Sequence, residues 1–259
     1  MRLQALILSL SGVLAASIGF GQQASSASKA NLCEIHINKV KPGMTRQYEE
    51  GRKKHMMWHR KQNDTWSWFT WEILTGENTG SYVIGSFGHQ WSDLDGRTQF
   101  EAADSADAMS HMGAYLESEM QSYYRFRSDL SLGNPSQQPT PLGTVTHYIL
   151  SPEGLNDFVE SVKKVGEGIK KTKYPMSGAT YWYQLINGGD SPHFVLVGER
   201  ANWAAFESPT DKTLDAMMEE AFGKEQGAAA LSNIRKAIRR VSTEAVRYRP
   251  ELSYVAEAK

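Results

Sequence analysis

The sequence predicts an α+β fold in which two copies of one βαββαβ unit pack sheet to sheet. Two segments follow the same order of strand, helix and turn patterns, shifted by roughly 110 to 122 residues. Alternation of apolar and polar residues marks the strands, and an apolar spacing near 3.6 residues marks the helices. Each copy also ends on a related motif, Arg125–Ser131 (RFRSDLS) and Arg247–Ser253 (RYRPELS). These agreements indicate an internal duplication.

The first copy opens with a strand at Leu32–Val40, and a helix follows Pro42. Aromatic strands are expected at Thr65–Leu74 and Tyr82–Phe87, separated by a Gly-rich turn, and a second helix precedes the closing strand. One stripe of the first helix is predicted to face the core. Its members are Met44, Tyr48, Gly51, His55 and Trp58.

The second copy repeats this order. Its strands are expected at Thr144–Leu150, Ala179–Ile186 and Phe194–Glu199, and its first helix follows Pro152. The core stripe of that helix is apolar throughout. Its members are Leu155, Phe158, Val162, Val165 and Ile169.

The order βαββαβ is that of the ferredoxin-like unit, whose sheet carries helices on one face only. The other face of each sheet needs cover, and two copies in one chain can cover each other as an intramolecular α+β barrel. We expect a first repeat at 31–132, a linker at 133–142 rich in Pro, Gln and Gly, and a second repeat at 143–259.

Residues 1–30 are interpreted as a signal peptide followed by a flexible leader. Arg2 precedes the uncharged apolar run Ala5–Phe20, and small residues that suit a cleavage site follow it. A membrane-spanning helix needs about 20 apolar residues, whereas this run is shorter and is interrupted by Ser9, Ser11 and Ser17. We therefore favour a cleaved signal peptide, with an uncleaved anchor as the alternative. The mature protein is expected to be periplasmic or secreted, with no stable membrane anchor.

Composition excludes several classes of function. The formal net charge of −1 gives no field that favours nucleic acid. Cys33 is the single cysteine, which excludes an intramolecular disulfide and any multi-cysteine metal site. The sequence has no Gly-rich phosphate loop and no GxSxG motif. The expected partner is a small-molecule ligand, and the expected state is a monomer or homodimer.

The chain resembles the dimeric α+β barrel superfamily, with its antibiotic-biosynthesis-monooxygenase-like, EthD-like and NIPSNAP-like families. The features that carry the resemblance are the βαββαβ order, the turn Lys41-Pro42-Gly43-Met44 entering a helix with Tyr48, and Trp91 and Trp203 after the third strands. The resemblance implies two fused copies of that fold. Its members include cofactor-free oxygenases, haem enzymes, isomerases and proteins without known activity, so it selects no reaction.

Strand alternation suggests which side chains line the space between the sheets. If the apolar set Cys33, Ile35 and Ile37 meets the helices, Glu34, His36 and Asn38 point into that space. We predict His36 as a general base, assisted by Glu34, with the alternative that His36 only makes structural hydrogen bonds. The remaining candidates for ligand binding are Asn38, Trp66, Trp68, Arg125, Arg127, Tyr148, Arg247 and Arg249. The arginines can instead solvate the closing strands.

Histidines outside this set are interpreted as packing residues. His55 and His59 lie four residues apart, a spacing that can bring two imidazoles to one metal, but the run HMMWH lacks the glutamate of the HExxH signature. His111 lies between Met109 and Met112, which are interpreted as core residues. His147 is expected to face the helices. We therefore assign no metal site and no cofactor.

Two functions are compatible with these patterns. The first is an exported small-molecule enzyme, a cofactor-independent oxygenase acting on an aromatic or anionic substrate. The alternative is a non-catalytic ligand-binding or stress-associated protein of the same fold. A haem-dependent enzyme is a third interpretation, which a Soret band would identify.

Overall fold

The computed structural model describes residues 30–133 and 138–257. The predicted signal peptide, most of the predicted leader and residues 134–137 of the predicted linker lie outside these residues. Within the described ranges, no helix is long and apolar enough to cross a membrane.

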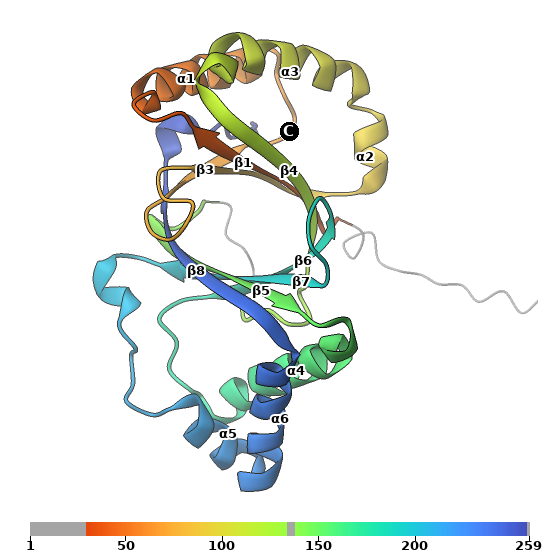
Figure 1. Cartoon of the computed structure of the whole chain (residues 1–259), viewed down its shortest axis with the longest axis vertical. Coiled ribbons are helices and arrows are strands. Elements are labelled where there is room, and N and C mark those ends of the chain that lie inside the picture. The colour runs from red at the N-terminus through yellow and green to blue at the C-terminus, as the bar shows by residue number, and fades with distance from the viewer. Residues whose placement is uncertain (1–29, 134–137, 258–259) are drawn as a thin grey trace, which may run out of the picture.

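Eight antiparallel strands close into a barrel at the centre of the molecule (Figure 1). The strands of the N-terminal half are β1 (Leu32–Val40), β2 (Phe69–Ile73), β3 (Tyr82–His89) and β4 (Leu116–Phe126). Those of the C-terminal half are β5 (Leu142–Leu150), β6 (Thr180–Asn187), β7 (His193–Arg200) and β8 (Ile238–Tyr248). The neighbours around the barrel are β1-β3-β2-β8-β5-β7-β6-β4. Each half therefore contributes four strands, and β2–β8 and β4–β6 pairs join the halves.

Helices cover the outside of the barrel at its two ends (Figure 1). In the N-terminal half these are α1 (Thr45–Lys61), the short α2 (Trp91–Asp95) and α3 (Thr98–Met112). In the C-terminal half they are α4 (Leu155–Thr172), α5 (Leu214–Phe222) and α6 (Lys224–Ala237). The α+β class and the strand–helix order agree with the prediction. The second helix of the C-terminal half differs, because Gly223 adopts a positive φ of 80° and separates α5 from α6.

The two layers between helices and sheet differ in chemistry. The C-terminal layer is apolar and is centred on Leu150, Phe158 and Phe194, which are all 0% exposed. The N-terminal layer contains apolar residues such as Tyr48 and Met56, but also many buried polar groups. In the described part of the chain, every buried charged or histidine side chain except Glu244 belongs to the N-terminal half. These side chains are Glu34, Arg52, His55, His59, Asp64, His89 and Arg97.

The segments after β4 and β8 cross into the opposite half. Leu132 pairs with Thr180 of β6, and Leu130 belongs to the apolar core of the C-terminal half. In the reciprocal crossing, Tyr254 pairs with Trp68, and Leu252 is fully buried against the N-terminal layer. The repeated motifs of the sequence lie at these two crossings, so each half of the barrel is completed by chain from the other.

Candidate functional site

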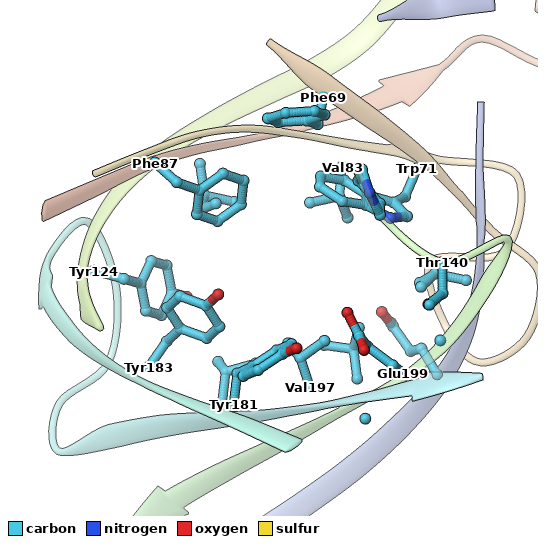
Figure 2. Close-up of a pocket in the computed structure, with 18 of the residues that line it drawn as sticks. Phe69, Trp71, Val83, Phe87, Tyr124, Thr140, Tyr181, Tyr183, Val197 and Glu199 are labelled. Carbon is cyan, nitrogen blue, oxygen red and sulfur yellow. The ribbon is translucent and has the colours of Figure 1, made fainter. Parts of the chain in front are cut away.

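A cavity of about 270 Å³ lies inside the barrel, between its two groups of strands. Much of its wall consists of alternate residues of the strands, such as Ile35 and Ile37 or Tyr181 and Tyr183, because side chains alternate between the two faces of a sheet. Figure 2 shows Phe69, Trp71 and Phe87 on one side of this space and Tyr124, Tyr181 and Tyr183 on another. Thr140, which belongs to the predicted linker, and Glu199 both lie at the border of the cavity.

The lining is aromatic and apolar, with a few polar groups. Among the described residues that line the cavity, none is Lys or Arg. Burial raises the pKa of Tyr124 to about 12, and burial followed by the neighbouring Glu199 raises that of Tyr181 to about 12. Burial also raises the pKa of Tyr183. All three rings therefore present neutral hydroxyl groups near pH 7, which can donate hydrogen bonds.

One part of the wall carries a histidine and a carboxylate. His147 Nε2 lies 4.0 Å from Glu244 Oε2, and its Nδ1 lies 3.1 Å from Nε2 of His193. Burial first, and then the nearby His193 and Arg240, lower the pKa of His147 to about 4. His147 is therefore neutral near pH 7. Its position in the cavity contradicts the prediction that it faces the helices.

The predicted face of β1 is wrong. Ile35 and Ile37 line the cavity, whereas Asn38 Nδ2 donates to the Tyr48 hydroxyl of α1 at 3.1 Å. Glu34, His36 and Asn38 thus face the N-terminal helices. The prediction identified the two alternating sets correctly but assumed that apolar side chains must meet the helices. In a closed barrel both faces of a strand are covered, and here the polar set meets a helix that itself carries buried polar groups.

His36 is held between two carboxylates on the helix side of the sheet. Its Nε2 lies 2.9 Å from Glu34 Oε1 and its Nδ1 lies 3.1 Å from Glu119 Oε1. Burial alone lowers the pKa of His36, but hydrogen bonds to Glu119 and Glu34 outweigh it and raise the pKa to about 9. An imidazolium at neutral pH has no lone pair to accept a proton, so this geometry gives no support to His36 as a general base.

Trp66 and Trp68 also lie outside the cavity, which corrects the prediction for both. They are buried in the N-terminal layer around Asp64, whose carboxylate accepts hydrogen bonds from Trp68 Nε1 and from the backbone N–H of Trp66. Asp64 also pairs with Arg97 at 2.6 Å and with His59 Nδ1 at 2.9 Å. Burial raises the pKa of Asp64, but these donors outweigh it and lower the pKa well below the usual range.

The predicted arginines and Tyr148 do not line the cavity either. Arg125 and Arg247 are exposed, and Arg127 forms a two-pronged ion pair with Asp129. Arg249 pairs with carboxylates of the N-terminal half, and Tyr148 packs in the C-terminal apolar layer. Phe126 and Tyr248, which alternate with these arginines, contact the cavity residues Tyr183 and Trp71 instead.

A second cluster of polar groups lies between α1, α3 and the loop after α1. His55 and His59 of α1 meet Asp104 and Asp107 of α3, and His59 also meets Asp64. Gly51 permits this approach, because a Cβ there would lie 2.3 Å from the carbonyl oxygen of His111 in α3. This cluster offers nitrogen and oxygen ligands that can hold a metal ion.

No protein-family signature matches the chain, and no curated protein is similar to it in sequence. Solved structures do match. An anthrone oxidase-like protein is 14% identical, with a TM-score of 0.53 over 87% of this chain and 94% of that one. A proposed monooxygenase from Lactobacillus acidophilus is 8% identical, with a TM-score of 0.55 over 88% and 97%.

A chlorite dismutase mutant from Candidatus Nitrospira defluvii is similar at the same level. It is 12% identical, with a TM-score of 0.51 over 86% of this chain and 93% of that one. The chain has the dimeric α+β barrel fold. At these identities the likeness concerns the fold alone, because one fold carries many activities.

Most of the cavity lining was missed by sequence reasoning, although the signal was present. Tyr181 and Tyr183 alternate on β6, and Tyr124 pairs with Cys33 on β1. All three point inward once the strand faces are reversed from those predicted for His36. Asp104 and Asp107 had no recognisable signal, since their meeting with α1 depends on how two helices pack.

Proposed function

We propose that this protein binds a neutral aromatic molecule of one or two rings inside its barrel and oxygenates it without a bound cofactor. The observation that carries the proposal is the aromatic cavity inside the barrel, because ligand sites are concave, largely apolar and supplied with a few polar groups. A dry apolar cavity of about 150 Å³ accommodates benzene. The volume of about 270 Å³ therefore suits one or two rings.

The charge of the cavity lining indicates which class of ligand the cavity can bind. Its charged members are the carboxylates Glu199 and Glu244, and the predicted arginines lie elsewhere. A neutral phenol or enol fits this wall better than the anionic substrate that the sequence suggested, since no cation would compensate a buried negative charge. The hydroxyls of Tyr124 and Tyr183 can orient such a polar substituent.

His147 takes the role of base in this proposal. Its imidazole is neutral and lies in the wall, and Glu244 can stabilise the imidazolium that forms. Removal of a proton from an activated ring carbon or hydroxyl makes an electron-rich anion that reduces dioxygen. Overall, a ring CH₂ and O₂ become a carbonyl and water, with one oxygen atom in each product. The names of two structural neighbours, anthrone oxidase-like and monooxygenase, favour this class.

We further propose that the two halves are fused copies of one ferredoxin-like unit and that the mature chain is exported as a monomer or homodimer. The duplication is supported by the strand order, which is β4-β1-β3-β2 in one half and β8-β5-β7-β6 in the other. It is also supported by the equivalent crossings of the two RxRxxLS-like motifs. The apolar N-terminal run of the sequence supports export.

The test combines ligand binding and oxygen consumption on the purified protein, with naphthols as probes, because their keto tautomers carry the ring CH₂ that the reaction oxidises. Val145→Phe fills the cavity and is expected to abolish binding, while His147→Gln is expected to retain binding and lose oxygen consumption. His111→Gln, in α3 and outside the cavity wall, is the matched control and should change neither. Unchanged binding by Val145→Phe refutes the cavity as the site. Saturable binding without oxygen consumption instead supports the non-catalytic alternative.

A further inference from the structure

Three side chains of the N-terminal layer bring their ligand atoms to one point. His55 and His59 lie one turn apart on α1, and Asp104 lies on α3. Their atoms form a nearly equilateral triangle: His55 Nε2 to His59 Nε2 is 3.1 Å, His55 Nε2 to Asp104 Oδ1 is 3.1 Å, and His59 Nε2 to Asp104 Oδ1 is 3.3 Å. His55 and His59 are 3% and 1% exposed.

Hydrogen bonds on the far side of each ring fix which nitrogen carries the proton. His55 Nδ1 lies 2.8 Å from Asp107 Oδ2, and His59 Nδ1 lies 2.9 Å from Asp64 Oδ2. A carboxylate accepts only, so each Nδ1 is the protonated nitrogen. In a neutral ring the lone pair is then on Nε2, and both Nε2 atoms point into the triangle. This is the arrangement by which carboxylates orient metal-binding histidines.

The third atom of the triangle is also an acceptor without a donor. Asp104 Oδ1 is buried and accepts no hydrogen bond, although two imidazole nitrogens lie within 3.3 Å of it. Two nitrogen lone pairs and one carboxylate oxygen therefore face one another in a buried space. Buried acceptors in this state are unfavourable unless a cation or a proton lies between them.

We propose that His55, His59 and Asp104 bind a divalent ion of the first transition series. Bonds of 2.0–2.1 Å to nitrogen and oxygen in tetrahedral geometry separate the ligand atoms by about 3.3 Å. The three separations in the structure, 3.1, 3.1 and 3.3 Å, match one face of such a tetrahedron. Two imidazoles and one carboxylate suit Zn²⁺ or Fe²⁺ and leave at least one position open for water or substrate.

The site is separate from the barrel cavity. None of the three ligands belongs to the cavity wall, and the layer that holds them is on the helix side of the N-terminal sheet. The proposed metal site therefore does not depend on the proposed oxygenase function, and each can be tested without the other. Aromatic rings of Trp58, Phe100 and Tyr254 surround the imidazoles and limit access of water.

The experiment measures metal binding to the chelator-treated, full-length mature protein. Titration with Co²⁺, followed by its visible absorption, and with Zn²⁺, followed by elemental analysis after gel filtration, is expected to give one ion per chain. His59→Gln and Asp104→Asn each remove a ligand and should abolish stoichiometric binding. Asp107→Asn leaves the three ligands in place and should weaken binding roughly 10- to 100-fold, as loss of a carboxylate behind a ligating imidazole does.

His111→Gln is the matched control, because His111 lies on the same helix as Asp104, meets Asp107 at 3.7 Å and contributes nothing to the triangle. It should bind Co²⁺ as the unaltered protein does. Equal loss with His111→Gln would place the ion on the surface of α3 and overturn the proposal. Absence of one ion per chain in the unaltered, folded protein also overturns it, and would leave a shared proton as the group between the imidazoles.

Discussion

Asp64 connects several buried groups of the N-terminal layer, and Asp64→Asn tests how much it stabilises the fold. Its side chain is 0% exposed and accepts hydrogen bonds from Arg97, from His59, from Trp68 and from the backbone of Trp66. An asparagine turns one acceptor into a donor and leaves the Arg97 guanidinium buried without a counter-charge. Removal of one partner of a buried pair costs about 3–5 kcal/mol. For a domain of this size that corresponds to a fall in Tm of roughly 6–20 °C.

The assay is urea unfolding of chelator-treated protein, so that a bound metal ion does not contribute to stability. Asp129→Asn is the matched control, because Asp129 pairs with Arg127 but its side chain is 45% exposed. An exposed pair contributes about 0–1 kcal/mol. The double variant Asp64→Asn/Arg97→Met should lose less than the sum of its single variants, since it removes the uncompensated charge. Equal small losses at Asp64 and Asp129 would refute the reasoning.

Two further predictions concern buried and close-packed positions. Because the pKa of His36 is raised to about 9 from an ordinary 6.5, its ion pairs stabilise the fold fully below pH 6.5, and this contribution is lost as the pH rises through 9. Relative to His36→Gln, the free energy of unfolding measured in urea should fall by about 3 kcal/mol at most between pH 6 and pH 10, and parallel profiles would contradict this. Gly51→Ala forces α1 from α3 and should destabilise by about 1–3 kcal/mol in the same assay. Gly166→Ala in α4, where a Cβ would lie 3.8 Å from Leu132, should instead stabilise by up to about 1 kcal/mol.

The α+β class and the order of strands and helices could be predicted because both depend on local patterns. The alternation in Leu32–Val40 and the apolar stripe of 155–169 each require only neighbouring residues. The facing of β1 could not be predicted in this way. Both faces of a strand in a closed barrel are covered, so Ile35 and His36 are each compatible with either side until the partner layers are known.

The composition of α1 does distinguish the two faces of β1. The predicted core stripe of α1 included Tyr48 and His55, whereas the corresponding stripe of the second copy is apolar throughout. A polar stripe requires polar partners, which favours Glu34 and Asn38 on the helix side. The position of Asp104 was beyond such reasoning, because it depends on the close contact of α1 with α3 at Gly51.

The crossing of the C-terminal segment has a consequence for how the chain matures. Leu252 and Tyr254 complete the core of the N-terminal half, although they follow the whole of the second half in the chain. The first half to be synthesised therefore closes only after the second half, because Trp68 and the backbone of Asp64 form hydrogen bonds with Tyr254, which follows β8. In vectorial folding, an N-terminal domain folds completely before the next domain is synthesised. This barrel cannot fold in that way, because its N-terminal core includes Leu252 and Tyr254. The two halves must reach their final packing together.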